Sequence, residues 1–303
     1  MATSPSAVVD HSAHTRFSDP GEHAALLAAL PTDPPAMAAV ARNVIVHYRS
    51  DGLDLPARTR DDINLRWVEA MLHTDQERHG TALAEPREAT ARLQGCCRDH
   101  SLLCVSALRT NGVPARTRVG YAGYFHSDWH ADHVVVEAWI EGRWRRFDPE
   151  IEGGFEALPE PMDMPTAELG STGFVTAAQV WAGFRAGALD ADTYGVDKSL
   201  PDLRGERFVF DEVIYEVAHR FGDELLLWDA WGRIAAPGTP VSAADAAWMD
   251  ETAALLLAAD AGDLEAEASL LERYRSDDGL HPGSEILSAS PVADGVVQVS
   301  LDR

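Results

Sequence analysis

Residues 133–149 read HVVVEAWIEGRWRRFDP, and this stretch is the strongest structural signal in the chain. Its first eight residues are β-branched, aromatic or alternating in polarity, which predicts a strand. Glu141-Gly142 has the composition of a two-residue hairpin turn, after which the chain returns as an antiparallel strand. In the simplest register His133, at the start of the first strand, faces Asp148, at the end of the second. The hairpin therefore predicts that these two side chains are neighbours.

A helix is predicted upstream, over residues 95–111, beginning at or just after Cys97. A broad apolar face supports it, and Pro114 prevents its continuation. Unpaired N–H groups and the helix dipole at a helix N-terminus stabilise a thiolate, so we expect a lowered pKa for Cys97. Taken singly, a cysteine at a helix start is usually a buried structural thiol, a histidine before a strand is usually an edge residue, and Asp-Pro after a strand is usually a turn. Together they predict a nucleophilic cysteine facing a His–Asp pair.

Spaced motifs in this window resemble the bacterial transglutaminase-like superfamily. They are GCCRD at 95–99, ALRTNGVPAR at 107–116 and VGY at 119–121. HVVVE at 133–137 and WRRFDP at 144–149 are similar to two further strands of that family. The resemblance covers about residues 90–150. It implies an α+β, papain-like core in which the nucleophile helix packs on a small antiparallel sheet.

The resemblance also implies roles for individual residues. Cys97, rather than the adjacent Cys96, would be the nucleophile, His133 the base and acid, and Asp148 the group that orients His133. The backbone N–H of Cys97 and one upstream side chain would bind the oxyanion. The candidates for that side chain are Trp67, in a helix predicted over 61–72, and Gln94.

Two positions depart from the family pattern. Val135 stands where an aromatic residue is usual, and Glu150 where a small hydroxyl residue is common. The extra carboxylate of Glu150 either favours a cationic substrate or faces solvent.

The sequence HSDWHADH at 126–133 predicts a loop across the cleft, with Trp129 as a candidate substrate-binding residue, or else an ordinary surface loop. Its histidines and aspartates are also metal-ligand types, but no second ligand cluster accompanies them. We therefore expect no metal and no cofactor.

The 303 residues suffice for one large domain or two modest ones. We expect a flexible leader at 1–20, a transglutaminase-like catalytic core at 21–150, and a mainly helical region at 151–303 that packs on the core. The three cysteines all lie within 96–104, which is not the pattern of a disulfide framework.

The formal net charge is −24, from 49 acidic and 25 basic residues. A chain this acidic repels phosphate backbones and anionic lipid, so neither nucleic acid nor a membrane is expected as a partner. Residues 1–20 lack the pattern of a signal peptide, so the expected location is the cytoplasm. Lys198 is the only lysine, an arginine bias typical of GC-rich bacterial genes. The oligomeric state stays open.

The predicted function is thiol-dependent acyl transfer. Cys97 would attack an amide or thioester of a peptide or small biosynthetic intermediate, and water or an amine would accept the acyl group. The alternatives are a non-catalytic binding or scaffold protein that keeps this fold, and a redox protein that uses Cys96 and Cys97.

Overall fold

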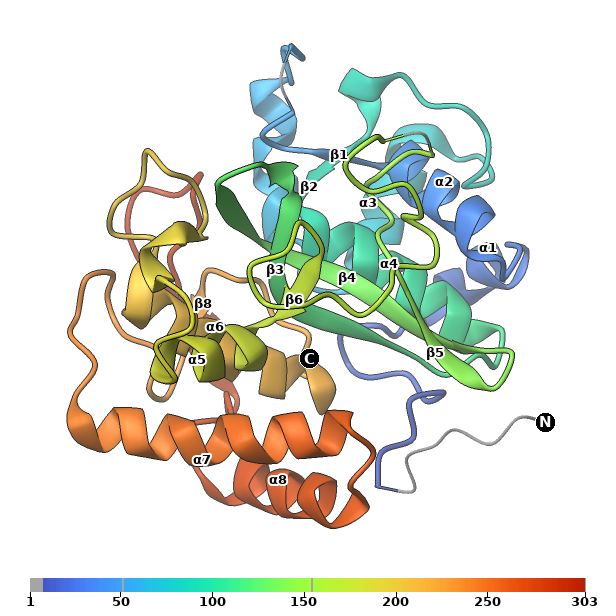
Figure 1. Cartoon of the computed structure of the whole chain (residues 1–303). Helices are drawn as coiled ribbons and strands as arrows, with labels where there is room; N and C mark the ends of the chain where they lie inside the picture. Colours follow the sequence, from blue (N-terminus) through green and yellow to red (C-terminus); the bar gives the residue numbers. More distant parts are fainter. Residues whose placement is uncertain (1–7, 51, 154, 303) are drawn as a thin grey trace.

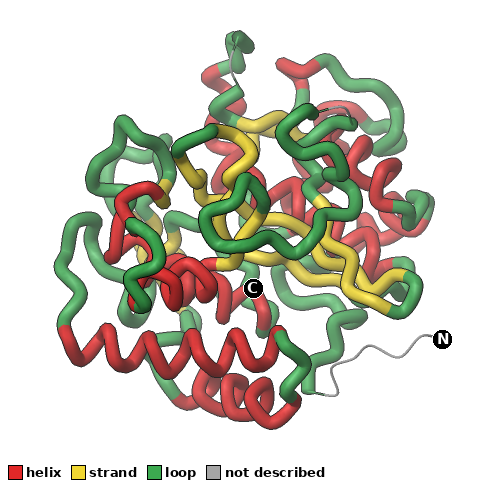
Figure 2. Tube along the Cα trace, in the orientation of Figure 1, coloured by secondary structure: helices red, strands yellow, loops and turns green. Residues whose placement is uncertain are grey.

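A computed structural model describes residues 8–50, 52–153 and 155–302, and Figures 1 and 2 show its elements. The α-helices are α1 (Ala24–Ala28), α2 (Pro34–Val44), α3 (Val68–His79), α4 (Cys97–Thr110), α5 (Ala177–Arg185), α6 (Gly205–Arg220), α7 (Ala243–Asp260) and α8 (Leu264–Ser276). Short 3₁₀ helices are η1 (Gly21–His23), η2 (Ala57–Asn64), η3 (Ala89–Ala91) and η4 (Ala191–Thr193). The strands are β1 (Ile45–His47), β2 (Leu93–Gly95), β3 (Ala115–His126), β4 (Trp129–Ile140), β5 (Arg143–Phe147), β6 (Phe174–Thr176), β7 (Tyr194–Gly195), β8 (Asp229–Ala230), β9 (Glu285–Ser288) and β10 (Val297–Ser300).

The central sheet has the strand order β5-β4-β3-β6, with β7 paired to β4. All of these pairs are antiparallel except the β4–β7 pair. Helices α4 and α6 pack on one face of the sheet and share the main core with it. The opposite face carries a smaller cluster that includes Tyr124, Val135 and Phe174. The predicted α+β architecture, with a nucleophile helix against a small antiparallel sheet, is confirmed (Figure 1).

The β4–β5 hairpin exists as predicted, but its register was wrong by two residues. Ile140 pairs with Arg143 and Val136 with Phe147. Both turn residues lie outside the ladder because Glu141 and Gly142 have positive φ angles of 54° and 80°. Such a turn matches the right-handed twist of the flanking strands. The shift is even, so each side chain stays on its predicted face of the sheet.

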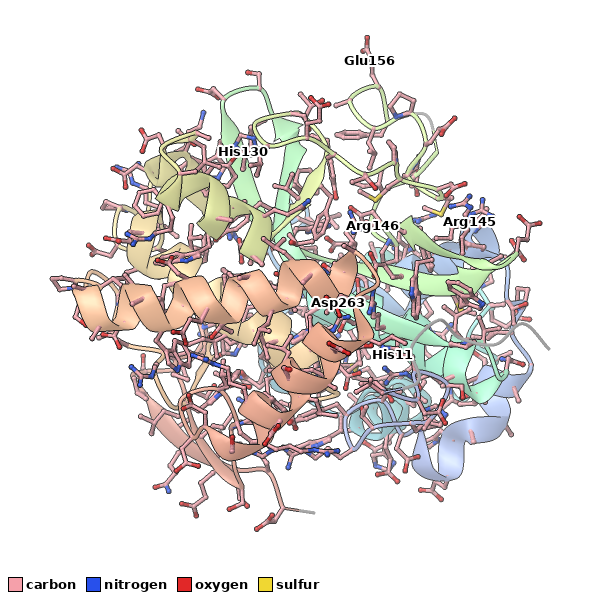
Figure 3. All side chains as sticks on the ribbon, turned by 60° about the horizontal axis from the view of Figure 1, so that its bottom comes forward. His11, His130, Arg145, Arg146, Glu156 and Asp263 are labelled. Carbon is pink, nitrogen blue, oxygen red and sulfur yellow. The ribbon has the colours of Figure 1, made fainter. Side chains whose placement is uncertain are left out.

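The first described residues are packed, in contrast to the expected flexible leader at 1–20; residues 1–7 lie outside the described residues. Phe17 is fully buried, and Val68 at the start of α3 donates its N–H to the Phe17 carbonyl at 2.9 Å. The ring of His11, labelled in Figure 3, meets Trp144 edge-on at a centroid distance of 5.5 Å. Local periodicity is absent here because these residues are held by long-range contacts.

The region after residue 150 contributes α5 to α8. It also supplies β6 and β7 to the central sheet and the separate three-stranded sheet β10-β9-β8. Since the central sheet contains strands from both sides of residue 150, the division at residue 150 stays a prediction. Within the described residues, each helix is too short or too polar to cross a membrane.

Candidate active site

Cys97 is the first residue of α4, as the sequence predicted. The helix begins here because the Asp99 carboxylate accepts the N–H of Cys96 at 2.9 Å, a capping contact that fixes the first turn. Gly95 precedes it for a steric reason. A Cβ at this position would lie 2.7 Å from the Ile45 side chain and 2.9 Å from Asp99 Oδ2.

Arg98 anchors this helix start to distant parts of the chain. Its side chain is fully buried, and it donates to the Arg66 carbonyl at 2.6 Å and, through Nε, to the Glu224 carbonyl at 2.9 Å. It also pairs with Asp99 at 2.9 Å. A buried guanidinium held by several acceptors has little freedom, so the position of Cys97 is rigidly set.

The same helix meets the strand that carries the histidine. Strand β5 pairs with β4 only as far as Val136, which leaves the next part of this edge of β4 open. Ser101, one helical turn after Cys97, fills it by donating to the Val134 carbonyl at 2.8 Å. The nucleophile helix is thereby docked beside His133.

His133 and Asp148 form a buried pair with defined geometry. His133 is 3% exposed and Asp148 fully buried, and His133 Nε2 lies 2.8 Å from Asp148 Oδ2. Tyr124 donates its hydroxyl to the same oxygen at 2.6 Å, and the N–H of Glu150 donates to Oδ1 at 2.9 Å. Asp148 therefore accepts three hydrogen bonds, and Nε2 is the ring nitrogen used to orient His133. Nδ1 stays on the other side of the ring.

Glu150 faces that other side, contrary to a solvent-exposed turn position. Its side chain is 14% exposed, and Oε2 lies 3.9 Å from His133 Nδ1. Oε1 lies 3.1 Å from Nδ1 of His100, a residue of α4 whose Nδ1 also lies 3.0 Å from the Cys96 carbonyl. Glu150 thus bridges the nucleophile helix and the histidine strand. His100 and this role of Glu150 were missed by the sequence analysis.

The charges in this cluster shift one another's pKa. Burial alone would raise the pKa of Glu150, but His47, His100 and His133 hold it below its usual value. Burial lowers the pKa of His133, while Asp148 and then Glu150 raise it, and the net pKa lies above the usual histidine value. These histidines and carboxylates form one coupled electrostatic unit.

The pKa of Cys97 differs from the expected lowering. The hydrogen bond with the Cys96 thiol, burial, and the charges of Glu150 and Asp132 together hold it well above its usual value. A raised pKa favours the protonated thiol at Cys97. Burial and the neighbouring Asp148 charge raise the pKa of Tyr124, so its hydroxyl stays the donor to Asp148.

Trp67, one of the two candidate oxyanion donors, lies near the start of α4 through the segment that contacts Arg98. Trp67 is the N-cap residue of α3, part-buried against the core, at the end of the segment that Arg98 holds. It stays a candidate oxyanion donor. The expected helix over 61–72 is instead broken at this point between η2 and α3.

Gln94 is not available as an oxyanion donor. Its side-chain amide donates to the Pro56 carbonyl and to Thr59 Oγ1, each at 2.9 Å. Both N–H groups of the amide are used by these two contacts. The prediction for Gln94 was wrong because a long-range contact to the segment before η2 captures it.

The expected loop over 126–133 is instead the β3–β4 hairpin. His126 pairs with Trp129, and β4 is continuous from Trp129 onward. Trp129 is 3% exposed and lies four residues before His133, which is ~13 Å along an extended strand. A lid or substrate-binding role for Trp129 is therefore not supported.

The side chains of His133, Asp148 and Glu150 also place ligand-type atoms within 4.8 Å of one another. Such a group has the composition of a metal site. Here Asp148 bonds to His133 and Tyr124, and Glu150 Oε1 lies 3.1 Å from His100 Nδ1, so each of the three groups faces a protein partner.

Comparisons with known proteins give one family match. Residues 60–149 match the model of the transglutaminase-like superfamily. Among solved structures, the chain is similar to a candidate cysteine protease from Cytophaga hutchinsonii, with 20% sequence identity and a TM-score of 0.29. That alignment covers 49% of this chain and 45% of the other, so the chain spans less than half of that protein. No curated protein matches the sequence.

Proposed function

Because residues 60–149 form a transglutaminase-like core, we propose that this protein is a cysteine-dependent acyl-transfer enzyme in which Cys97 carries the acyl group. The observation that supports this most is the pairing of His133 Nε2 with a buried, hydrogen-bonded Asp148, beside a helix that begins with Cys97. This arrangement leaves Nδ1 of His133 to exchange a proton with the thiol.

In the proposed reaction, His133 Nδ1 takes the proton of the Cys97 thiol as the sulfur attacks the carbonyl carbon of an amide or thioester. The backbone N–H of Cys97, at the free N-terminus of α4, stabilises the oxyanion, and Trp67 is the candidate second donor. The bond to the amine or thiol leaving group then breaks, and that group receives the proton from His133. Water or an amine attacks the thioacyl enzyme, with His133 again acting as base, and regenerates Cys97.

A neutral resting thiol fits general-base catalysis rather than a preformed ion pair. The proton leaves Cys97 only as the new bond forms, so the base must be unprotonated beforehand. Since Asp148 and Glu150 raise the pKa of His133, activity should increase as the pH rises through that raised pKa. The proposed substrate class is a peptide or small biosynthetic acyl compound.

A direct test is intact-protein mass spectrometry after brief exposure to p-nitrophenyl acetate. We expect one acetyl adduct on Cys97, absent in Cys97→Ser and retained in the matched neighbour variant Cys96→Ser. Cys104, buried with a raised pKa, serves as an unlabelled internal control. Adding a primary amine during deacylation then measures whether the acyl group passes to the amine or to water.

The two alternatives predict different outcomes for the same variants. A scaffold protein would label slowly, with Cys97 no faster than a free thiol and no effect of His133→Gln. A redox protein would lose its activity equally in Cys96→Ser and Cys97→Ser.

A further inference from the structure

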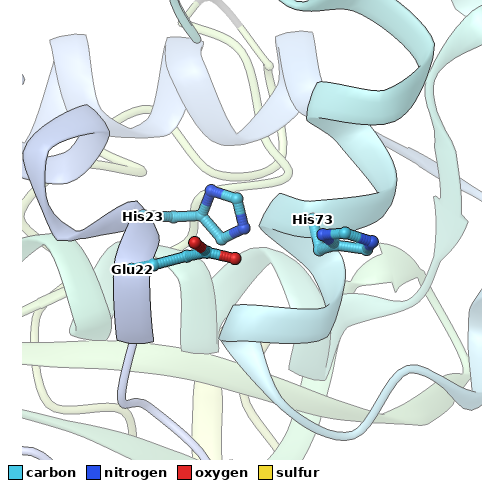
Figure 4. A group of neighbouring side chains, drawn as sticks. All are labelled: Glu22, His23 and His73. Atoms are coloured by element: carbon cyan, nitrogen blue, oxygen red, sulfur yellow. The ribbon is translucent and has the colours of Figure 1, made fainter.

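A second group of ligand-type side chains lies away from Cys97, where η1 meets α3. Figure 4 shows Glu22 and His23 on η1, with His73 facing them from α3. One ligand atom from each of the three residues lies within 4.8 Å of the others. The two imidazole rings have a centroid distance of 5.9 Å. Nothing in the proposed acyl-transfer chemistry uses this group.

His23 gives an independent indication that something is bound here. Its Nε2 atom is buried and has no hydrogen-bond partner among the described residues. A shielded polar atom without a partner costs ~1–3 kcal/mol, so such atoms are normally satisfied. Glu22 and His73 are both exposed, which leaves their side chains free to turn toward a ligand that His23 would share.

Neighbouring carboxylates favour a cation at this position. Glu77 lies one helical turn after His73, with Oε1 3.4 Å from His73 Nε2. Glu69 lies one turn before it, and its carboxylate packs over Gly21, the residue before Glu22. An acidic neighbour that holds one ring nitrogen of a ligating histidine orients the other nitrogen toward a metal.

We propose that Glu22, His23 and His73 form a binding site for a divalent transition-metal ion, with zinc as the best match. Two imidazoles and one carboxylate are a common zinc ligand set, and water would complete the tetrahedron. Calcium and magnesium prefer sites built entirely from oxygen atoms, which this set is not. No sequence motif indicates this site, because His23 and His73 lie far apart in the chain.

The site would attach the N-terminal segment to the catalytic core. The same junction is already bridged by the hydrogen bond from Val68 to Phe17, one turn away from the site along α3. A metal shared by η1 and α3 adds a second cross-link there. Because it binds only the folded arrangement, the metal stabilises the protein by an amount that grows with the logarithm of its concentration above Kd.

The test uses the full chain carrying Cys97→Ser, which removes the thiol near the other ligand-type cluster. Zinc binding is measured by isothermal titration calorimetry, and Co²⁺ absorption reports the coordination geometry. We expect one equivalent bound, a tetrahedral Co²⁺ spectrum and a melting temperature that rises with zinc. His73→Ala should weaken binding at least about tenfold, and Glu22→Gln should weaken it as well.

The matched control is His126→Ala, which removes an exposed histidine elsewhere and should leave zinc affinity unchanged. Equal affinity in His73→Ala and His126→Ala would overturn the proposal. Loss of binding only in a His133→Gln variant would overturn it too, because it would place the metal in the active site. Since every protein in the test already lacks Cys97, the result is independent of the proposed enzymatic function.

Discussion

Strand β4 carries two buried charge networks on one face, four residues apart, and they are built in opposite ways. At Glu137, Arg116 and Arg146 donate to the carboxylate at 2.8 and 2.7 Å, and Arg118 lies 3.5 Å away. At His133, one ring nitrogen is bonded to Asp148, while the nearest carboxylate to the other, Glu150, lies 3.9 Å away.

The difference separates structure from chemistry. Burial would raise the pKa of Glu137, but its arginines hold it well below the usual value, so this carboxylate does not change its protonation state near neutral pH. In the His133 network, burial lowers the pKa of the histidine while Asp148 and Glu150 raise it. His133 Nδ1 lies 3.9 Å from Glu150, which leaves this nitrogen for proton transfer. A carboxylate held by several guanidinium groups stabilises the fold, whereas a histidine with one ring nitrogen left for proton transfer can react.

The largest expected effect is a loss of acylation when His133 is replaced. His133→Gln keeps a side chain of similar size but removes the base, and acylation of Cys97 by p-nitrophenyl acetate should slow by about 10⁴-fold or more. The free energy of unfolding should change far less than in the Glu137 variant below. An acylation rate within tenfold of wild type would show that the two networks do not differ as argued.

The second largest expected effect is a loss of stability without a loss of acylation. Glu137→Ala leaves three buried or half-buried guanidinium groups without their shared carboxylate, which should lower the free energy of unfolding by about 3–5 kcal/mol. The acylation rate per folded molecule should stay close to wild type. Urea denaturation measures the first quantity, and active-site titration normalises the second.

The control for that prediction is Glu156→Ala, an exposed glutamate labelled in Figure 3. Its stability should be unchanged. If Glu137→Ala were as stable as this control, or if it abolished acylation while remaining folded, Glu137 would belong to the reactive network instead.

A third prediction concerns pH. Glu150 raises the pKa of both His133 and Cys97, so removing its charge in Glu150→Gln should lower both. The pH–rate profile for acylation should therefore move to lower pH, whichever group each limb reports. Glu152→Gln, an exposed neighbour, should leave the profile in place. A profile that moved upward, or not at all, would remove Glu150 from the coupled unit.

The sequence predicts the parts of this site that depend on local pattern. The helix start at Cys97 follows from the apolar face and stop signals of α4, and the β4–β5 hairpin follows from its alternation and turn residues. The registration error arose from counting Glu141 and Gly142 as paired residues. With the observed register, in which Val136 faces Phe147, extending the ladder brings residue 150 opposite residue 133. The correct turn would therefore have pointed to Glu150.

Other features depend on contacts that no local pattern reports. Glutamine is usually an exposed, mobile residue, yet the Gln94 amide is hydrogen-bonded to the Pro56 carbonyl and to Thr59. The N-terminal segment lacks periodicity, yet Phe17 is fully buried. His100 carries no motif of its own and is brought to Glu150 only by the docking of α4 on β4. Long-range packing decides each of these, so one sequence does not specify them.

The smallest expected effect is at the edge of the reactive network. Tyr124→Phe removes the hydroxyl that donates to Asp148 Oδ2, the oxygen that also holds His133. A hydrogen bond to a charged acceptor contributes ~1.5–3 kcal/mol, and loss of orientation should slow acylation by about tenfold. Tyr215→Phe is the matched control, because it removes a buried hydroxyl bonded to the Asp229 carbonyl at 2.7 Å. Tyr215→Phe should lose somewhat less stability because its acceptor is a neutral carbonyl, and only Tyr124→Phe should slow acylation. Equal acylation rates in the two variants would show that Asp148 orients His133 without help from Tyr124.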